Sequence, residues 1–149
     1  MRLCLSLALC TLFTSPLLAE FSLQTVDDAV REMAIYQVSV REDIALFNDQ
    51  LNHTITHAQS HKDHTTETDQ ERDLLKESTI LYQVLQDYYS KDSALFDYLE
   101  GLFEGYNAIL KEALQVPHLA PLIPLLHEIV DQIQTMAQLE RKITTLIDE

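Results

Sequence analysis

Thiols and flexible residues are scarce in this chain. Of its 149 residues only two are cysteines, Cys4 and Cys10, and both lie within the first ten positions. Glycine also occurs only twice. Apolar and polar residues alternate nowhere for more than about five positions, so no β-strand is predicted. Neither a disulfide-stapled fold nor a β-sheet fold is therefore expected.

Basic residues are also few. Lys and Arg together number 10 against 24 Asp and Glu, which gives a formal net charge of −14 at pH 7. Nucleic acids and anionic membranes bind clustered Lys and Arg that replace their counterions. Neither is expected as a partner, whereas a basic protein surface or cations would suit this charge.

Motifs for catalysis are missing as well. The sequence has no G-x-S-x-G elbow, no glycine-rich phosphate loop, no H-E-x-x-H and no Glu-x-x-His pair of the di-iron type. Carboxylates are plentiful, but they occupy positions that a solvated helix surface explains. We therefore predict that the protein is not an enzyme.

The N-terminus has the pattern of a secretory signal peptide over residues 1–19. Arg2 precedes the apolar run Leu3–Leu12, and Pro16 lies shortly before the expected cleavage after Ala19. The apolar run is shorter than the roughly 20 residues that span a bilayer. We predict export to a periplasm or the cell exterior, and a single thiol-free domain over residues 20–149.

The remaining chain has the apolar spacing of amphipathic helices. The first seam opens at Thr25, a predicted N-cap, and follows steps of three and four residues through Val26, Val30, Met33, Gln37, Val40, Ile44, Phe47 and Leu51. Thr68 and Glu71 fit a capping box at the start of the next helix. The same seam then runs through residues 69–116 as one helix or two, with a break preferred at residues 90–93 and Asp92 as the new N-cap.

Three prolines between Pro117 and Pro124 end that segment. Pro124 is suited to the first turn of a last helix that runs to about Ile147, with Glu140 as the one polar residue on its seam. The predicted class is all-α, an antiparallel bundle of three to four long amphipathic helices with coiled-coil-like seams. The first helix should be the longest, and the helix after residue 93 should be the central one.

Four histidines form the only cluster that suggests chemistry: His53, His57, His61 and His64. Their steps of four, four and three residues place them within about a quarter of a helix circumference. Such pairs chelate Zn, Cu or Ni, with Asp63 or Glu67 as a further ligand. A closed site would need a ligand from elsewhere, such as His118 or His127. A solvated polar tip and a response to acidic pH are the alternatives.

Two further features suggest contact surfaces. Gly101 and Gly105 form a small-x₃-small pair, which permits close approach of two helices. Tyr89 and Tyr98 would be candidate anchors for a partner if they are exposed.

Together these features predict an exported, non-enzymatic helical interaction protein, an adaptor or assembly factor that binds a protein partner or itself. The alternatives are a divalent-metal-binding or buffering protein that uses the histidines, and a helical holdase chaperone.

Overall fold

The computed structural model describes residues 25–60, 66–89 and 96–148, almost all of which are helical. Four α-helices occur, with one short 3₁₀ helix between the last two, and no strand is present in these ranges. In chain order they are α2 (Val26–Ser60), α3 (Thr66–Tyr89), α4 (Phe96–Ala113), η1 (Pro117–Leu122) and α5 (Ile123–Asp148). The predicted all-α bundle is confirmed.

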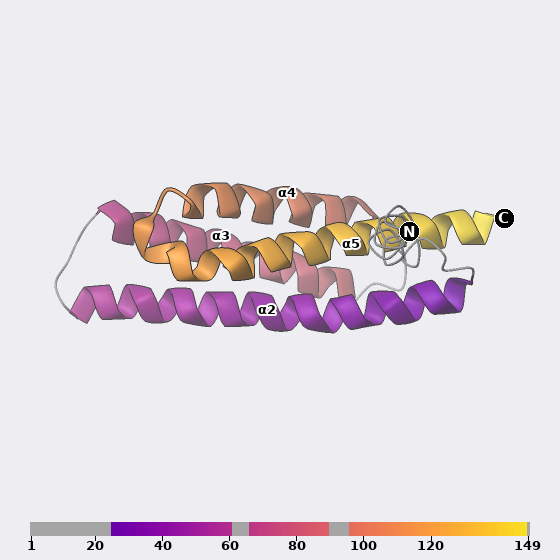
Figure 1. The fold of residues 1–149 in the computed structure, drawn as a ribbon, viewed down its shortest axis with the longest axis horizontal. Helices are drawn as coiled ribbons and strands as arrows, with labels where there is room; N and C mark the ends of the chain where they lie inside the picture. The colour runs from indigo at the N-terminus through magenta and orange to yellow at the C-terminus, as the bar shows by residue number, and fades with distance from the viewer. Residues whose placement is uncertain (1–24, 61–65, 90–95, 149) are drawn as a thin grey trace, which may run out of the picture.

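Successive helices run in opposite directions, and the last returns beside the first (Figure 1). The main contacts join α2 to α3, α3 to α4, α4 to α5 and α5 back to α2. This is the four-helix form of the predicted bundle, and α2, with 35 residues, is the longest helix. The expected central role of α4 is wrong. In a ring of four, each helix packs mainly on two neighbours, so no helix is enclosed by the others.

The start of α2 follows the sequence signal. The backbone N–H of Asp28 donates to Oγ1 of Thr25 at 3.1 Å, which confirms the N-cap. The start of α3 does not follow it, because this helix begins at Thr66, two residues before the expected cap. Thr68 and Glu71 instead lie inside α3 with buried side chains. Thr68 and Glu71 therefore do not cap the start of α3. Both are polar residues on the buried side of this helix.

The helix breaks occur where they were predicted. The helix α3 ends at Tyr89 and α4 begins at Phe96, so the segment after residue 69 forms two helices. Asp92, the predicted N-cap, lies outside the described residues. The prolines form η1, and Pro124 is the second residue of α5, where a missing amide proton costs no helix hydrogen bond.

The core is a continuous apolar cluster to which every α-helix contributes. Its α2 face is formed by Ala29, Met33, Val40, Ile44, Phe47, Leu51 and Ile55. Val30 belongs to the predicted seam but is 49% exposed, and Ala29 takes its place in the core. A straight helix drifts by about 20° per heptad relative to a strict seven-residue repeat, so the buried position moves to a neighbouring residue.

A buried polar layer joins three helices in the middle of this core. Ser78 in α3 donates to Oδ1 of Asn48 in α2 at 2.5 Å, and its Oγ lies 3.3 Å from the hydroxyl of Tyr106 in α4. The Tyr106 hydroxyl also lies 3.3 Å from the carbonyl oxygen of Ser78, to which it donates. Ser78, a polar residue on the predicted seam, is thus accommodated by partners from two other helices.

A second buried polar contact joins α3 to α5. Tyr88 donates a hydrogen bond to Oε1 of Glu140, and both side chains are at most 5% exposed. Glu140, the polar residue on the seam of the last helix, is therefore buried against a specific donor. Its Oε2 has no hydrogen-bond partner in the part of the chain that the structure describes.

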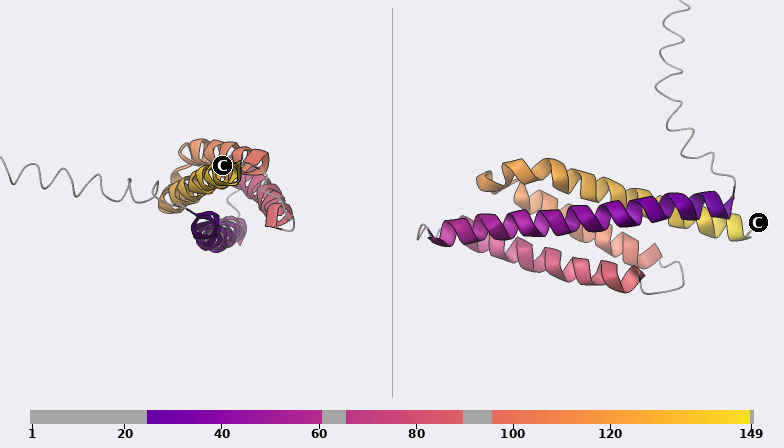
Figure 2. Two further views of the ribbon diagram at one scale, coloured as in Figure 1. Left: turned by 90° about the vertical axis from the view of Figure 1, so that its right-hand side faces the viewer. Right: turned by 90° about the horizontal axis from the view of Figure 1, so that it is seen from below.

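The four helices have unequal lengths, which leaves one end of the bundle thinner than the rest. The first turns of α2 and the last turns of α5 project beyond the ends of α3 and α4, as two views show (Figures 1 and 2). Side chains on this part of α2 have fewer helices to cover them. More of their surface therefore remains in solvent.

Candidate functional site: the surface of α2

The predicted histidine stripe lies only partly within the described residues. His53 and His57 are exposed on α2, one helical turn apart. His61, His64 and Asp63 lie outside the described residues. Within the described ranges, no three His, Cys, Asp or Glu side chains are arranged to hold a metal ion. Binding of Zn, Cu or Ni by the four histidines stays a prediction. Of the four, the structure describes only the exposed pair His53 and His57.

Folding brings His118 to α3, where it contacts acidic residues. Its Nδ1 lies 3.3 Å from Oε2 of Glu67 and 3.9 Å from Oε1 of Glu71. The imidazole itself is largely exposed, whereas the Glu71 side chain is 1% exposed. These contacts tie the η1 corner to the first turns of α3. Glu67, considered above as a metal ligand, thus has an imidazole from a distant part of the chain beside it.

Burial raises the pKa of Glu71, and the nearby carboxylate of Glu67 raises it further, while His118 lowers it. An acid whose pKa is raised by folding favours the folded state below its unfolded pKa, and this contribution is lost as pH rises through the folded pKa. Glu71→Gln should therefore raise Tm by a few degrees at pH 8 and leave it unchanged at pH 4. Thermal unfolding of both proteins across this range would test it, and a loss of stability at pH 8 would contradict it.

The two glycines have different surroundings in α4. A Cβ at Gly105 would lie 2.7 Å from both methyl carbons of Leu81, so α3 and α4 approach closely there. Gly101 is exposed, and a Cβ there would meet nothing within 4 Å. Of the two glycines, Gly105 therefore permits close packing between α3 and α4 within the chain, whereas Gly101 does not take part in this contact. A dimer face at Gly101 and Gly105 stays a prediction.

Replacing each glycine by alanine should have opposite effects. Gly101→Ala should stabilise the protein by about 0.5–1 kcal/mol, because alanine favours the helix and finds open space. Gly105→Ala should destabilise it by about 1 kcal/mol, because Leu81 must move out of a packed position. Urea unfolding of the two variants measures both values, and equal stabilisation would show that the contact with Leu81 is unimportant.

Of the two tyrosines proposed as partner anchors, the structure places only the side chain of Tyr98. Tyr98 is half-buried and packs against the core. Tyr89 is the last residue of α3, and its side chain lies outside the described residues. The structure therefore brings Tyr98 into the bundle and leaves Tyr89 as a prediction.

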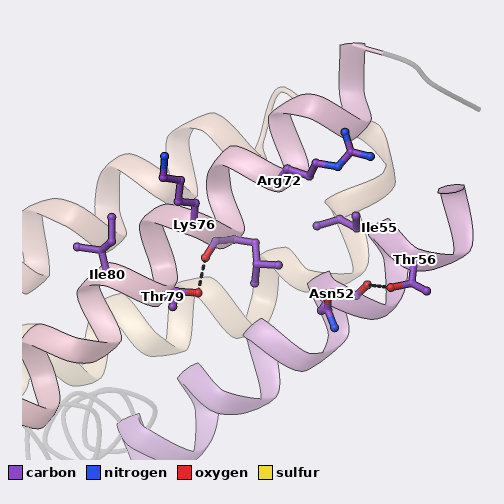
Figure 3. Close-up of a pocket in the computed structure, with 8 residues that line it drawn as sticks. Asn52, Ile55, Thr56, Arg72, Lys76, Thr79 and Ile80 are labelled. Carbon is purple, nitrogen blue, oxygen red and sulfur yellow. Dashed lines mark hydrogen bonds between the residues drawn. The ribbon is translucent and has the colours of Figure 1, made fainter.

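An open groove of about 510 Å³ lies between α2 and α3. Arg72 and Lys76 line it from α3 (Figure 3), while the hydroxyls of Thr56 and Thr79 bond to carbonyls of their own helices. None of its lining residues is a carboxylate, an imidazole or a thiol: Asn52, Ile55, Thr56, Arg72, Leu75, Lys76, Thr79 and Ile80. The groove therefore holds no pair for general acid–base catalysis.

The most unusual surface of the bundle lies on α2. Four of the seven large, exposed apolar side chains among the described residues belong to this helix: Val30, Ile35, Val38 and Leu46. Ile35 is 64% exposed, and Val38 and Leu46 are nearly half exposed. At 100° per residue, these three lie on an arc of about 80° on the side opposite the core residue Met33. We define the outer stripe as these three side chains together with the exposed Ala34, Glu42 and Ala45.

The outer stripe follows a helical spacing of its own. Ile35, Val38, Glu42 and Ala45 are separated by three, four and three residues, the same steps as the core seam. Ala34, Ile35, Val38, Ser39 and Glu42 line an open hollow on this surface. The spacing of the core seam gives no indication of this second stripe. A search for a second apolar periodicity on the same helix would have found it.

No family model, curated protein or solved structure matches this chain. Of the helices that the structure describes, none combines the length and apolar character needed to cross a bilayer.

Proposed function

We propose that this protein is an exported, non-enzymatic adaptor or assembly factor that binds another protein chain through the outer stripe of α2. The observation that carries the proposal is the double amphipathicity of this helix. One face of α2 is buried in the core, and the opposite face still presents Ile35, Val38 and Leu46 to solvent.

Contiguous exposed apolar residues on a folded surface are typical of sites for protein partners. Helical apolar faces commonly dock through anchors at i and i+3, and Ile35 and Val38 have this spacing, whereas Glu42 is a polar residue between them and Leu46. A holdase is less well supported, because the outer stripe lies along one helix and encloses no cavity for a client.

A site-specific crosslinker tests the proposal directly. A photoreactive residue at Val38 should give one defined adduct in cells of the source organism, and Ile35→Glu in the same chain should abolish it. The matched control places the photoreactive residue at Gln134, which is exposed on α5 and away from the outer stripe.

The proposal predicts an adduct from Val38 and none from Gln134. If Val38 gives no defined adduct with any protein, or if Ile35→Glu leaves the adduct unchanged, the outer stripe is not an interaction surface and the proposed function is wrong.

A further inference from the structure

We infer that the chain bound at the outer stripe is a second copy of this protein, packed antiparallel so that the two α2 helices cross a twofold axis near residue 40. This inference rests on the proposed function, since it identifies the partner at the same surface. Opposite charges bracket the outer stripe, and their placement on α2 favours this arrangement.

Opposite charges stand at the two ends of the outer stripe. Arg31 and Asp49 are both exposed, and they are 18 residues apart, which is five full helical turns, so they lie on the same side of α2. No ion pair within the described ranges engages either of them. Both charged groups are therefore available to a partner.

The placement of these charges selects the orientation of the pair. In an antiparallel pair centred on residue 40, Arg31 of each copy faces Asp49 of the other, which gives two attractive contacts. A parallel pair in register would place Arg31 opposite Arg31 and Asp49 opposite Asp49. A twofold contact of this kind is self-complementary and gives a closed dimer.

The outer stripe lies around this line of contact. At 100° per residue, Ile35 and Ala45 lie 80° apart around α2, and Ala34 and Leu46 lie 120° apart in the opposite sense, so these side chains flank the line between Arg31 and Asp49 instead of facing one another across it. Val38 then faces Glu42, the one carboxylate within the outer stripe. Glu42 should weaken the contact, because its charge loses water there without a cation opposite it.

The expected dimer can be measured by sedimentation equilibrium at physiological ionic strength, where charges more than about 8 Å apart are largely screened. The full protein should dimerise, and Ile35→Glu should weaken the dimer by about 100-fold or more. Arg31→Asp and Asp49→Arg should each weaken it by about ten-fold, because each reversal creates two repulsive contacts. The double variant Arg31→Asp/Asp49→Arg should restore it to within about three-fold.

Two further variants define the contact. Glu42→Leu should tighten the dimer, because it removes the carboxylate from the contact. Lys111→Asp, on an exposed position of α4, changes the net charge as Arg31→Asp does and should leave the affinity unchanged. All substituted side chains are exposed, so thermal unfolding should show intact folds.

The proposal is wrong if the protein stays monomeric at 100-fold the protein concentration of the crosslinking experiment. It is also wrong if the double variant does not restore the dimer affinity that each single charge reversal weakens. A Val38 adduct with a different protein would keep the proposed function and overturn the second copy as occupant. An adduct of twice the chain mass, lost with Ile35→Glu, supports both.

Discussion

Tyr88→Phe should lower the free energy of unfolding by about 2–4 kcal/mol, one of the largest effects expected of a single removed atom in this protein. The Tyr88 hydroxyl is the only hydrogen-bond donor to the Glu140 carboxylate among the described residues. Without it, a buried polar group has no partner. For a chain of this size the loss corresponds to a fall in Tm of roughly 8–15 °C, measurable by calorimetry.

A double-mutant cycle separates this mechanism from a general loss of packing. Tyr88→Phe/Glu140→Leu removes both polar groups together, and its stability should lie within about 1 kcal/mol of the natural protein. Glu140→Gln, which keeps an acceptor for Tyr88, should cost less than Tyr88→Phe. If the double variant were less stable than either single variant, the hydrogen bond would not be the source of the effect.

Tyr106→Phe should make the protein less sensitive to alkali. Tyr106 is fully buried, and burial raises the pKa of its phenol well above the ordinary value near 10, with a smaller opposing effect of its hydrogen bond to Ser78. Such a group stabilises the fold below the unfolded pKa, and this stability is lost as pH rises above about 10. The loss approaches 1.4 kcal/mol per pH unit.

Urea unfolding at pH 8 and at about pH 11 would show the effect. At pH 8 the Tyr106→Phe variant should be less stable by about 1 kcal/mol, because the contacts with Ser78 are lost. At the higher pH this deficit should vanish or reverse. Tyr98→Phe, at a half-buried tyrosine, serves as the control and should keep the alkaline sensitivity of the natural protein. A constant deficit at both pH values would contradict the prediction.

Local features of the sequence predicted most of the helical architecture. The N-cap at Thr25, the break before Phe96 and the proline-bounded corner at η1 all follow from preferences of a few adjacent residues. The buried face of α2 also followed from spacing, except at Val30, where helical drift moved the buried position to Ala29. These features depend on residues within a turn or two of one another, so the sequence contains the information needed to predict them.

The partners of polar residues could not be predicted in the same way. Glu140 and Tyr88 are 52 positions apart, and Gln132 and Asp43, whose side chains bond at 3.0 Å between α5 and α2, are 89 apart. Which helices adjoin decides these pairs, and no local pattern contains that information. His118 likewise comes to Glu67 only through the turn at η1.

The outer stripe shows where sequence and tertiary structure divide. The order of residues alone is enough to specify α2 as a long helix with an apolar seam, because helical periodicity is a property of neighbouring residues. It also contained a second apolar spacing at Ile35, Val38 and Leu46, but a periodicity does not say which face is covered. The packing of the other helices sets which face is covered, because α3 and α5 pack on the side of Met33 and Leu51 and leave the opposite side in solvent.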